Sequence, residues 1–174
     1  MSNSQRKKYL WYPLGKLITV ISVFTMLGIN WFNVNSDDLL LVVGGTWLWV
    51  GLIHLLPLIV LSVCHQKIST GASFTINALN KEYRYKKEGI DLSFNSSQIK
   101  EVIKIVSPPK YDDRMDLLGF GHFYYWKLIL VDGTILSLSC MLLDSEEFAG
   151  HEIRKEKQMF PIPKEIKTGM TIEP

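Results

Sequence analysis

Two long apolar segments near the start of the chain constrain its fold more than any other feature. Residues 10–32 and 39–63 are apolar almost throughout, and a short polar link, 33–38, separates them. A helix of roughly 20 residues crosses the ~30 Å hydrocarbon core of a bilayer, and both segments reach that length. Because the link is short, we expect an antiparallel helical hairpin with spans at about 12–32 and 39–63.

A basic start followed by an apolar run is also typical of a secretory signal peptide. This run is long for one, it ends in the bulky Trp31 and Phe32, and no small-residue cleavage pattern follows. We therefore predict an uncleaved anchor in the cell (inner) membrane. Lysine and arginine occur before the first span and after the second, whereas the link has none, so both termini are expected in the cytoplasm.

His54 is the one ionisable residue deep in the second predicted span. Such a residue is a candidate for proton or metal chemistry. Its expected depth, towards the cytoplasmic end, would let a neutral imidazole bond to a hydroxyl or to interfacial water, so a packing role is favoured. An accessory subunit of a transport complex is an alternative function, although two spans offer little surface for a substrate path unless the chain forms a homo-oligomer.

The remainder of the chain, from Cys64 onward, is long enough for one small domain. It carries 15 of the 19 basic and 15 of the 17 acidic side chains, so it is neutral overall. This balance argues against a general nucleic-acid binder. The two cysteines and four histidines have no ligand-like spacing, so neither a metal site nor another cofactor is predicted.

From Ser73 onward, apolar and polar residues alternate and turn residues recur, which is typical of an antiparallel sheet. About six strands are predicted. The clearest hairpin flanks Asp132-Gly133, the signal for a two-residue type I′ turn. One face of that hairpin carries the expected core: Trp126, Leu128, Leu130, Leu136, Leu138 and Cys140.

The end of the chain has a capping-box spacing at Asp144 and Glu147, which predicts a helix through Phe148 to about Gln158. The expected organisation is a tail and hairpin at 1–65, a β domain at 66–163 and a flexible tail at 164–174. Residues 110–122 are predicted to form a long mobile loop.

The turn Glu88-Gly89-Ile90, the run 97–102 and the hairpin 132–140 together resemble bacterial pleckstrin-homology-like domains, which often follow a pair of transmembrane helices. The resemblance implies an α+β membrane protein in which a small bent antiparallel sheet or partial barrel follows the hairpin, with a short C-terminal helix. The family's barrel has seven strands, one more than the pattern predicts here.

No residue pattern favours catalysis, so the chain is not expected to be an enzyme. Asp112, Asp113 and Asp116 lie near His122, which could suggest a metal or a general base, but a solvated loop is favoured. Ser137 and Ser139 lack the glycines of a nucleophile elbow.

Two binding hypotheses remain. The first is an interaction module whose outer sheet face, with Phe123, Tyr125, Lys127 and Ile129, binds a membrane or cytoplasmic partner protein. Cover by the C-terminal helix or by a second copy of the chain is the alternative for that face.

The second hypothesis is recognition of anionic lipid head groups by a basic strand, against which a solvated strand face is the simpler interpretation. The residues of that strand are Lys81, Arg84, Lys86 and Lys87.

Overall fold

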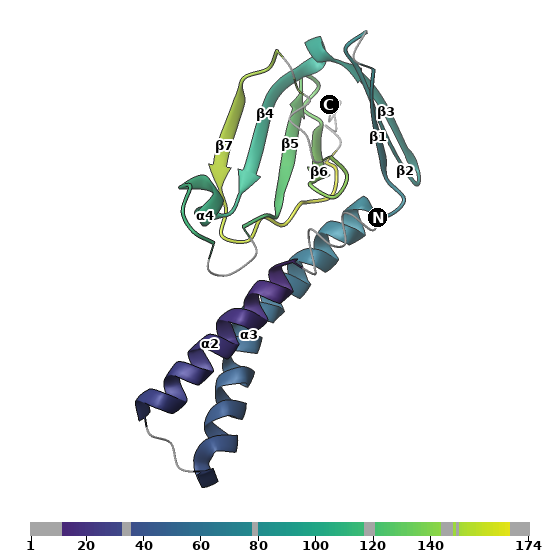
Figure 1. Ribbon diagram of the computed structural model, residues 1–174. Helices are drawn as coiled ribbons and strands as arrows, with labels where there is room; N and C mark the ends of the chain where they lie inside the picture. Colours follow the sequence, from purple (N-terminus) through teal and green to yellow (C-terminus); the bar gives the residue numbers. More distant parts are fainter. Residues whose placement is uncertain are drawn as a thin grey trace, which may run out of the picture.

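The computed structural model describes residues 12–32, 36–77, 80–116, 121–143, 148 and 150–167 (Figure 1). Helices α2 (Tyr12–Phe32) and α3 (Ser36–Ser69) pack against each other as a hairpin. The hairpin projects from one end of the β part, defined here as residues 73–167 (Figure 1). Helix α2 coincides with the first predicted span, whereas α3 begins three residues before the second and ends six residues after it.

The hairpin exposes apolar surface along most of its length. Among the described residues, one segment, Leu40–Ser69, is long and apolar enough to cross a membrane, with a mean hydropathy of 2.2, and α2 contributes the shorter apolar stretch Ile18–Trp31. Large apolar side chains such as Phe24, Leu40 and Leu41 are exposed. An apolar surface of this extent is one that lipid or another protein covers.

The β part consists of two sheets. Strands β1 (Ser73–Asn77), β2 (Glu82–Lys87) and β3 (Ile90–Asn95) form an antiparallel sheet in that order. After the 3₁₀ turn η2 (Ser96–Gln98), the second sheet has the order β6-β5-β4-β7 and comprises β4 (Ile99–Val106), β5 (Tyr124–Leu130), β6 (Ile135–Ser139) and β7 (Ile153–Lys157). Seven strands are therefore present in the described chain, one more than predicted. The short helix α4 (Pro108–Tyr111) occupies the start of the predicted loop.

The six predicted core residues of the β5–β6 hairpin are confirmed, since each is at most 5% exposed. Five of them pack between the two sheets, against Tyr83, Tyr85 and Phe94 from the three-stranded sheet. The sixth, Cys140, belongs to a second cluster that includes residues of α3. Alternation along the strands explains this result, because the side chains of every second residue point to one face.

The predicted helix from Phe148 to Gln158 is wrong, because Ile153–Lys157 form β7, parallel to β4. Gly150 has φ +96°, a conformation that a helix excludes. Strand β7 also supplies hydrogen-bond partners to the backbone groups at the edge of β4. This contribution is absent from a prediction based on local helix propensity. Ile153 packs on the main core, while the charged residues after it suit an edge strand.

The turn of the β5–β6 hairpin also differs from the predicted type I′ turn. Leu130 accepts a bond from Gly133 N at 3.1 Å and donates to Thr134 O at 2.9 Å, which leaves a three-residue loop. Gly133 has φ +84°, whereas Asp132 is not among the described residues with positive φ. This is a type I turn followed by a left-handed glycine. Asp132 accepts bonds from the backbone and hydroxyl of Thr134 instead, at 2.8 and 2.9 Å.

Candidate functional site

The end of α3 docks on the β part along one helical face. Leu58, Leu61, His65 and Ile68 are buried and recur every three or four residues. We call this contact the joint; it comprises Leu58, Leu61 and His65 with Phe123, Cys140 and Met141. The opposite face of the same turns, with Ile59, Val60 and Val63, is exposed. Helix α3 is therefore part of the β part's core from Leu58 onward.

His65 is the polar centre of the joint. It is fully buried, and its ring is tilted by 47° against that of Phe123, with the two ring centroids 5.1 Å apart. Nε2 lies 2.7 Å from the carbonyl oxygen of Pro161, which can only accept, so Nε2 carries the hydrogen. Nδ1 then accepts from the hydroxyl of Ser139 at 2.8 Å. A neutral imidazole satisfies both contacts.

The protonation of His65 follows from this environment, which lies beyond the predicted span and inside the β part. Burial, with a smaller contribution from nearby His122, lowers its pKa from 6.5 to about 4, against the opposing effect of the hydrogen bond to the Pro161 carbonyl. His65 is therefore neutral at physiological pH. The apolar spacing that continues past Val63 is a local signal for this buried position, whereas the histidine expected to matter from the sequence was His54. His54 lies on α3, and its side chain is outside the described part.

The four residues predicted to bind a partner do not share one surface. Phe123 is 0% exposed and belongs to the joint. Tyr125 packs with Ile129 and with two isoleucines of β4 on the other face of the sheet, and Lys127 is half-buried beside them. The C-terminal segment 158–167 partly covers this face, in place of the helix that had been considered as cover.

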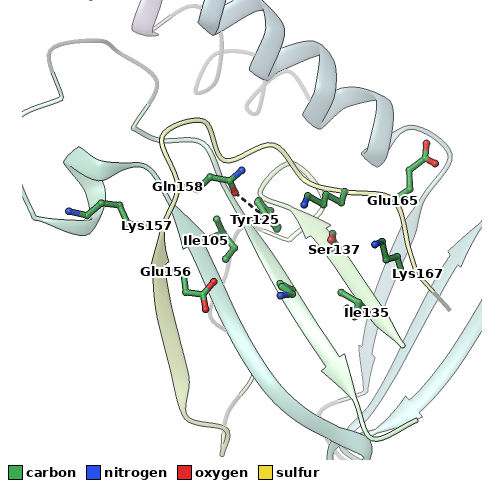
Figure 2. Close-up of a pocket in the computed structure, with 11 residues that line it drawn as sticks. Ile105, Tyr125, Ile135, Ser137, Glu156, Lys157, Gln158, Glu165 and Lys167 are labelled. Carbon is green, nitrogen blue, oxygen red and sulfur yellow. Dashed lines mark hydrogen bonds between the residues drawn. The ribbon is translucent and has the colours of Figure 1, made fainter. Parts of the chain in front are cut away.

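The face that holds Tyr125 and Lys127 contains an open groove of about 440 Å³, the sheet groove (Figure 2). Ile105, Tyr125 and Ile135 form its apolar floor. Figure 2 shows Glu156 on one side and Lys167 on the other, with the Tyr125 hydroxyl donating to Gln158 Oε1 at 3.2 Å. Volumes of this order are typical of ligand sites.

The C-terminal segment forms one wall of the sheet groove and is fastened at three points. Gln158 bonds to Tyr125 in the floor, and Pro161 bonds to His65 in the joint. Lys167 exchanges two backbone bonds with Ile135, at 2.8 and 3.1 Å. The residue that anchors α3 therefore also holds the wall of the sheet groove.

Positive charge exceeds negative charge around the sheet groove. Four lysines and two glutamates line it, a net charge of +2. Lys157 is paired with Asp112 at 2.7 Å, and its hydrogen bond holds the pKa of that carboxyl below its usual value. Glu156 is paired with Arg154. The other three lysines, Lys127, Lys164 and Lys167, form no ion pair with any residue that the structure describes.

The predicted basic strand has a different arrangement. Arg84 forms a two-pronged ion pair with Asp91, at 2.9 and 2.7 Å, and Lys86 lies 3.5 Å from the same carboxylate. Glu82 is exposed on that face as well, so two positive charges face two negative ones. Lys81 and Lys87 lie at opposite ends of β2, roughly 20 Å apart along an extended strand. These four residues do not converge on one site.

Two of the acidic loop residues, Asp112 and Asp116, have partners in the loop or on β7. Asp112 pairs with Arg114 as well as Lys157, and Asp116 accepts a bond from Gly121 N at 2.6 Å. In the parts of the chain that the structure describes, no three His, Cys, Asp or Glu side chains form a group that could hold a metal ion.

Comparison with known proteins gives one match. A family model described as a PH domain matches residues 1–151, a range that includes both helices of the hairpin and strands β1–β6. No curated protein and no solved structure matches the chain.

Proposed function

The chain belongs to the PH domain family, and on this premise we propose a membrane-anchored, non-catalytic interaction module that binds a partner protein in its sheet groove. The helical hairpin crosses the cell membrane, and both termini lie in the cytoplasm. The joint holds the β part at the membrane surface in a fixed orientation, so that the sheet groove faces partners from a constant position.

The lengths of the helices support this placement. The stretch of α3 from Asp38 to Pro57, before the joint, has 20 residues and spans about 30 Å, the thickness of the hydrocarbon core. Beyond it, one face of α3 contacts the β part while Ile59, Val60 and Val63 remain exposed for contact with lipid. In the proposed topology, the β part lies directly at the cytoplasmic leaflet.

The observation that carries the proposal is the combination, in one open groove, of an apolar floor and three lysines that form no ion pair within the described part of the chain. Ile105 and Tyr125 are largely buried and pack together, so the floor keeps its shape without a ligand. A pre-formed concave surface with a few polar groups at its rim is typical of a binding site.

Site-specific photo-crosslinking in intact cells tests the proposal. A photoreactive amino acid at Lys127, which lines the sheet groove, is expected to give a covalent product of higher mass. The matched control is Ser93, which is exposed on β3 outside the sheet groove. A product at 127 but not at 93 supports a partner in the groove, and a product of twice the chain's mass identifies that partner as a second copy. No product at 127, or equal products at both positions, contradicts the proposal.

A further inference from the structure

We propose that the sheet groove takes an extended acidic peptide segment of the partner, whose carboxylates meet Lys127, Lys164 and Lys167 and whose apolar side chains lie on the floor. This inference rests on the proposed function and specifies the chemistry of the partner. Three aspects of the structure carry it, namely charge, shape and the position of the C-terminal segment.

Charge complementarity predicts that the ligand carries negative charge. Lys127 belongs to β5, and Lys164 and Lys167 belong to the C-terminal segment, so both the sheet and this segment contribute an ammonium group to the sheet groove. Of the two glutamates, Glu156 is already paired with Arg154. Opposite charges across an interface speed association and select among partners, and here they favour a ligand with several carboxylates.

Shape favours an extended peptide over a single small anion. The apolar floor consists of one residue from each of three neighbouring strands, Ile105, Tyr125 and Ile135, so it runs across the sheet. An inorganic anion would leave this apolar surface unused. A peptide in which acidic and apolar side chains alternate points one set to the floor and the other to the lysines.

The C-terminal segment also separates the sheet groove from α3. Gln158 and Lys164 line the groove, and between them Ile162 packs on the joint beside Leu58 and Leu61. A lipid head group in the leaflet around α3 would have to reach past this segment. A segment of a protein approaches from the cytoplasm, so protein is the occupant that the geometry favours.

Peptide binding to the full chain in phosphatidylcholine nanodiscs tests the inference. The probe is a short fluorescent peptide in which glutamate alternates with leucine, and lysine replaces glutamate in the control peptide. Lys127→Glu with Lys164→Glu is expected to weaken binding by about tenfold or more. Lys100→Glu with Lys155→Glu changes the net charge equally at exposed positions outside the groove and is expected to leave the affinity unchanged. Added salt should weaken binding to the wild-type chain.

Each other outcome overturns the inference. If the two peptides bind equally well, the ligand is not selected for acidic side chains. If both double variants lose the same affinity, binding depends only on the net charge of the chain. If anionic nanodiscs alone protect Lys127 and Lys164 from an amine-reactive label, the occupant is lipid. No peptide binding together with a crosslink at 127 shows a partner of different chemistry, so only the inference fails. If neither peptide binding nor a crosslink at 127 is observed, the proposed function fails as well.

Discussion

Replacement of His65 by alanine is expected to lower the free energy of unfolding of the β part by about 3 to 5 kcal/mol. The change deletes a fully buried ring that packs against Phe123, and it leaves a cavity. It also leaves the carbonyl of Pro161 without its partner and the hydroxyl of Ser139 without its acceptor, although Ser139 Oγ still accepts from Met141 N at 3.1 Å. A buried polar group that loses its only partner costs more than the hydrogen bond itself contributes.

Hydrogen exchange in nanodiscs measures this effect by region. In His65→Ala, we expect faster exchange in β6 and in residues 158–163, because the joint holds both. The matched control is His151→Ala, which removes a half-buried histidine bonded to Ser96 at 2.7 Å, far from α3. Its effect should be smaller and confined to the region of η2. Equal exchange of β6 in the two variants would show that the joint does not stabilise the β part.

Acidification is expected to weaken the joint between pH 6.5 and pH 4. Burial lowers the pKa of His65 to about 4 in the folded chain, below its ordinary value of 6.5. The unfolded chain therefore binds a proton first as the pH falls. The stability from neutral His65 is fully present above pH 6.5 and is lost as the pH falls towards 4, by about 3 kcal/mol at most.

Denaturant unfolding of the wild-type chain and of His65→Leu over this pH range measures the loss. The leucine variant has no titrating group in the joint, so its stability should change less between pH 7 and pH 4.5. Carboxylates held by cations, such as Asp91 beside Arg84, contribute equally in both proteins and titrate at lower pH. Parallel curves for the two proteins would show that His65 is not buried as a neutral group.

Local sequence patterns predicted the parts of the fold that follow from the apolar residues of one helix or one strand. The helices followed from apolar length, and the core of the β5–β6 hairpin followed from alternation, since Trp126 and Leu136 occupy matching faces of paired strands. The turn between them was predicted in place but not in type. Asp132-Gly133 suits both a two-residue and a three-residue loop, and the bond of Asp132 to Thr134 favours the longer one.

The missed features depend on contacts between residues far apart in sequence. Residues 153–157 carry a charged pattern compatible with a helix, and only the free edge of β4 makes them a strand. His65 meets Ser139 and Pro161 across 74 and 96 positions, so the local apolar spacing indicates a buried face of α3 but not the residues that this face contacts. Two residues that line the sheet groove, Tyr125 and Lys127, are among those expected from the sequence on the outer face of the sheet. Its other wall belongs to a segment that had been predicted as a flexible tail from Lys164 onward.

The central claim is that α3 and the β part move as one body, which holds the sheet groove in a fixed position at the membrane. Spin labels at Leu48, exposed on α3 before the joint, and Lys155, exposed on β7, measure the distance across it once Cys64 is replaced by serine. In nanodiscs, pulsed electron paramagnetic resonance should give one narrow distance distribution for the otherwise wild-type chain. A broad distribution, as from a β part on a flexible tether, would contradict the account.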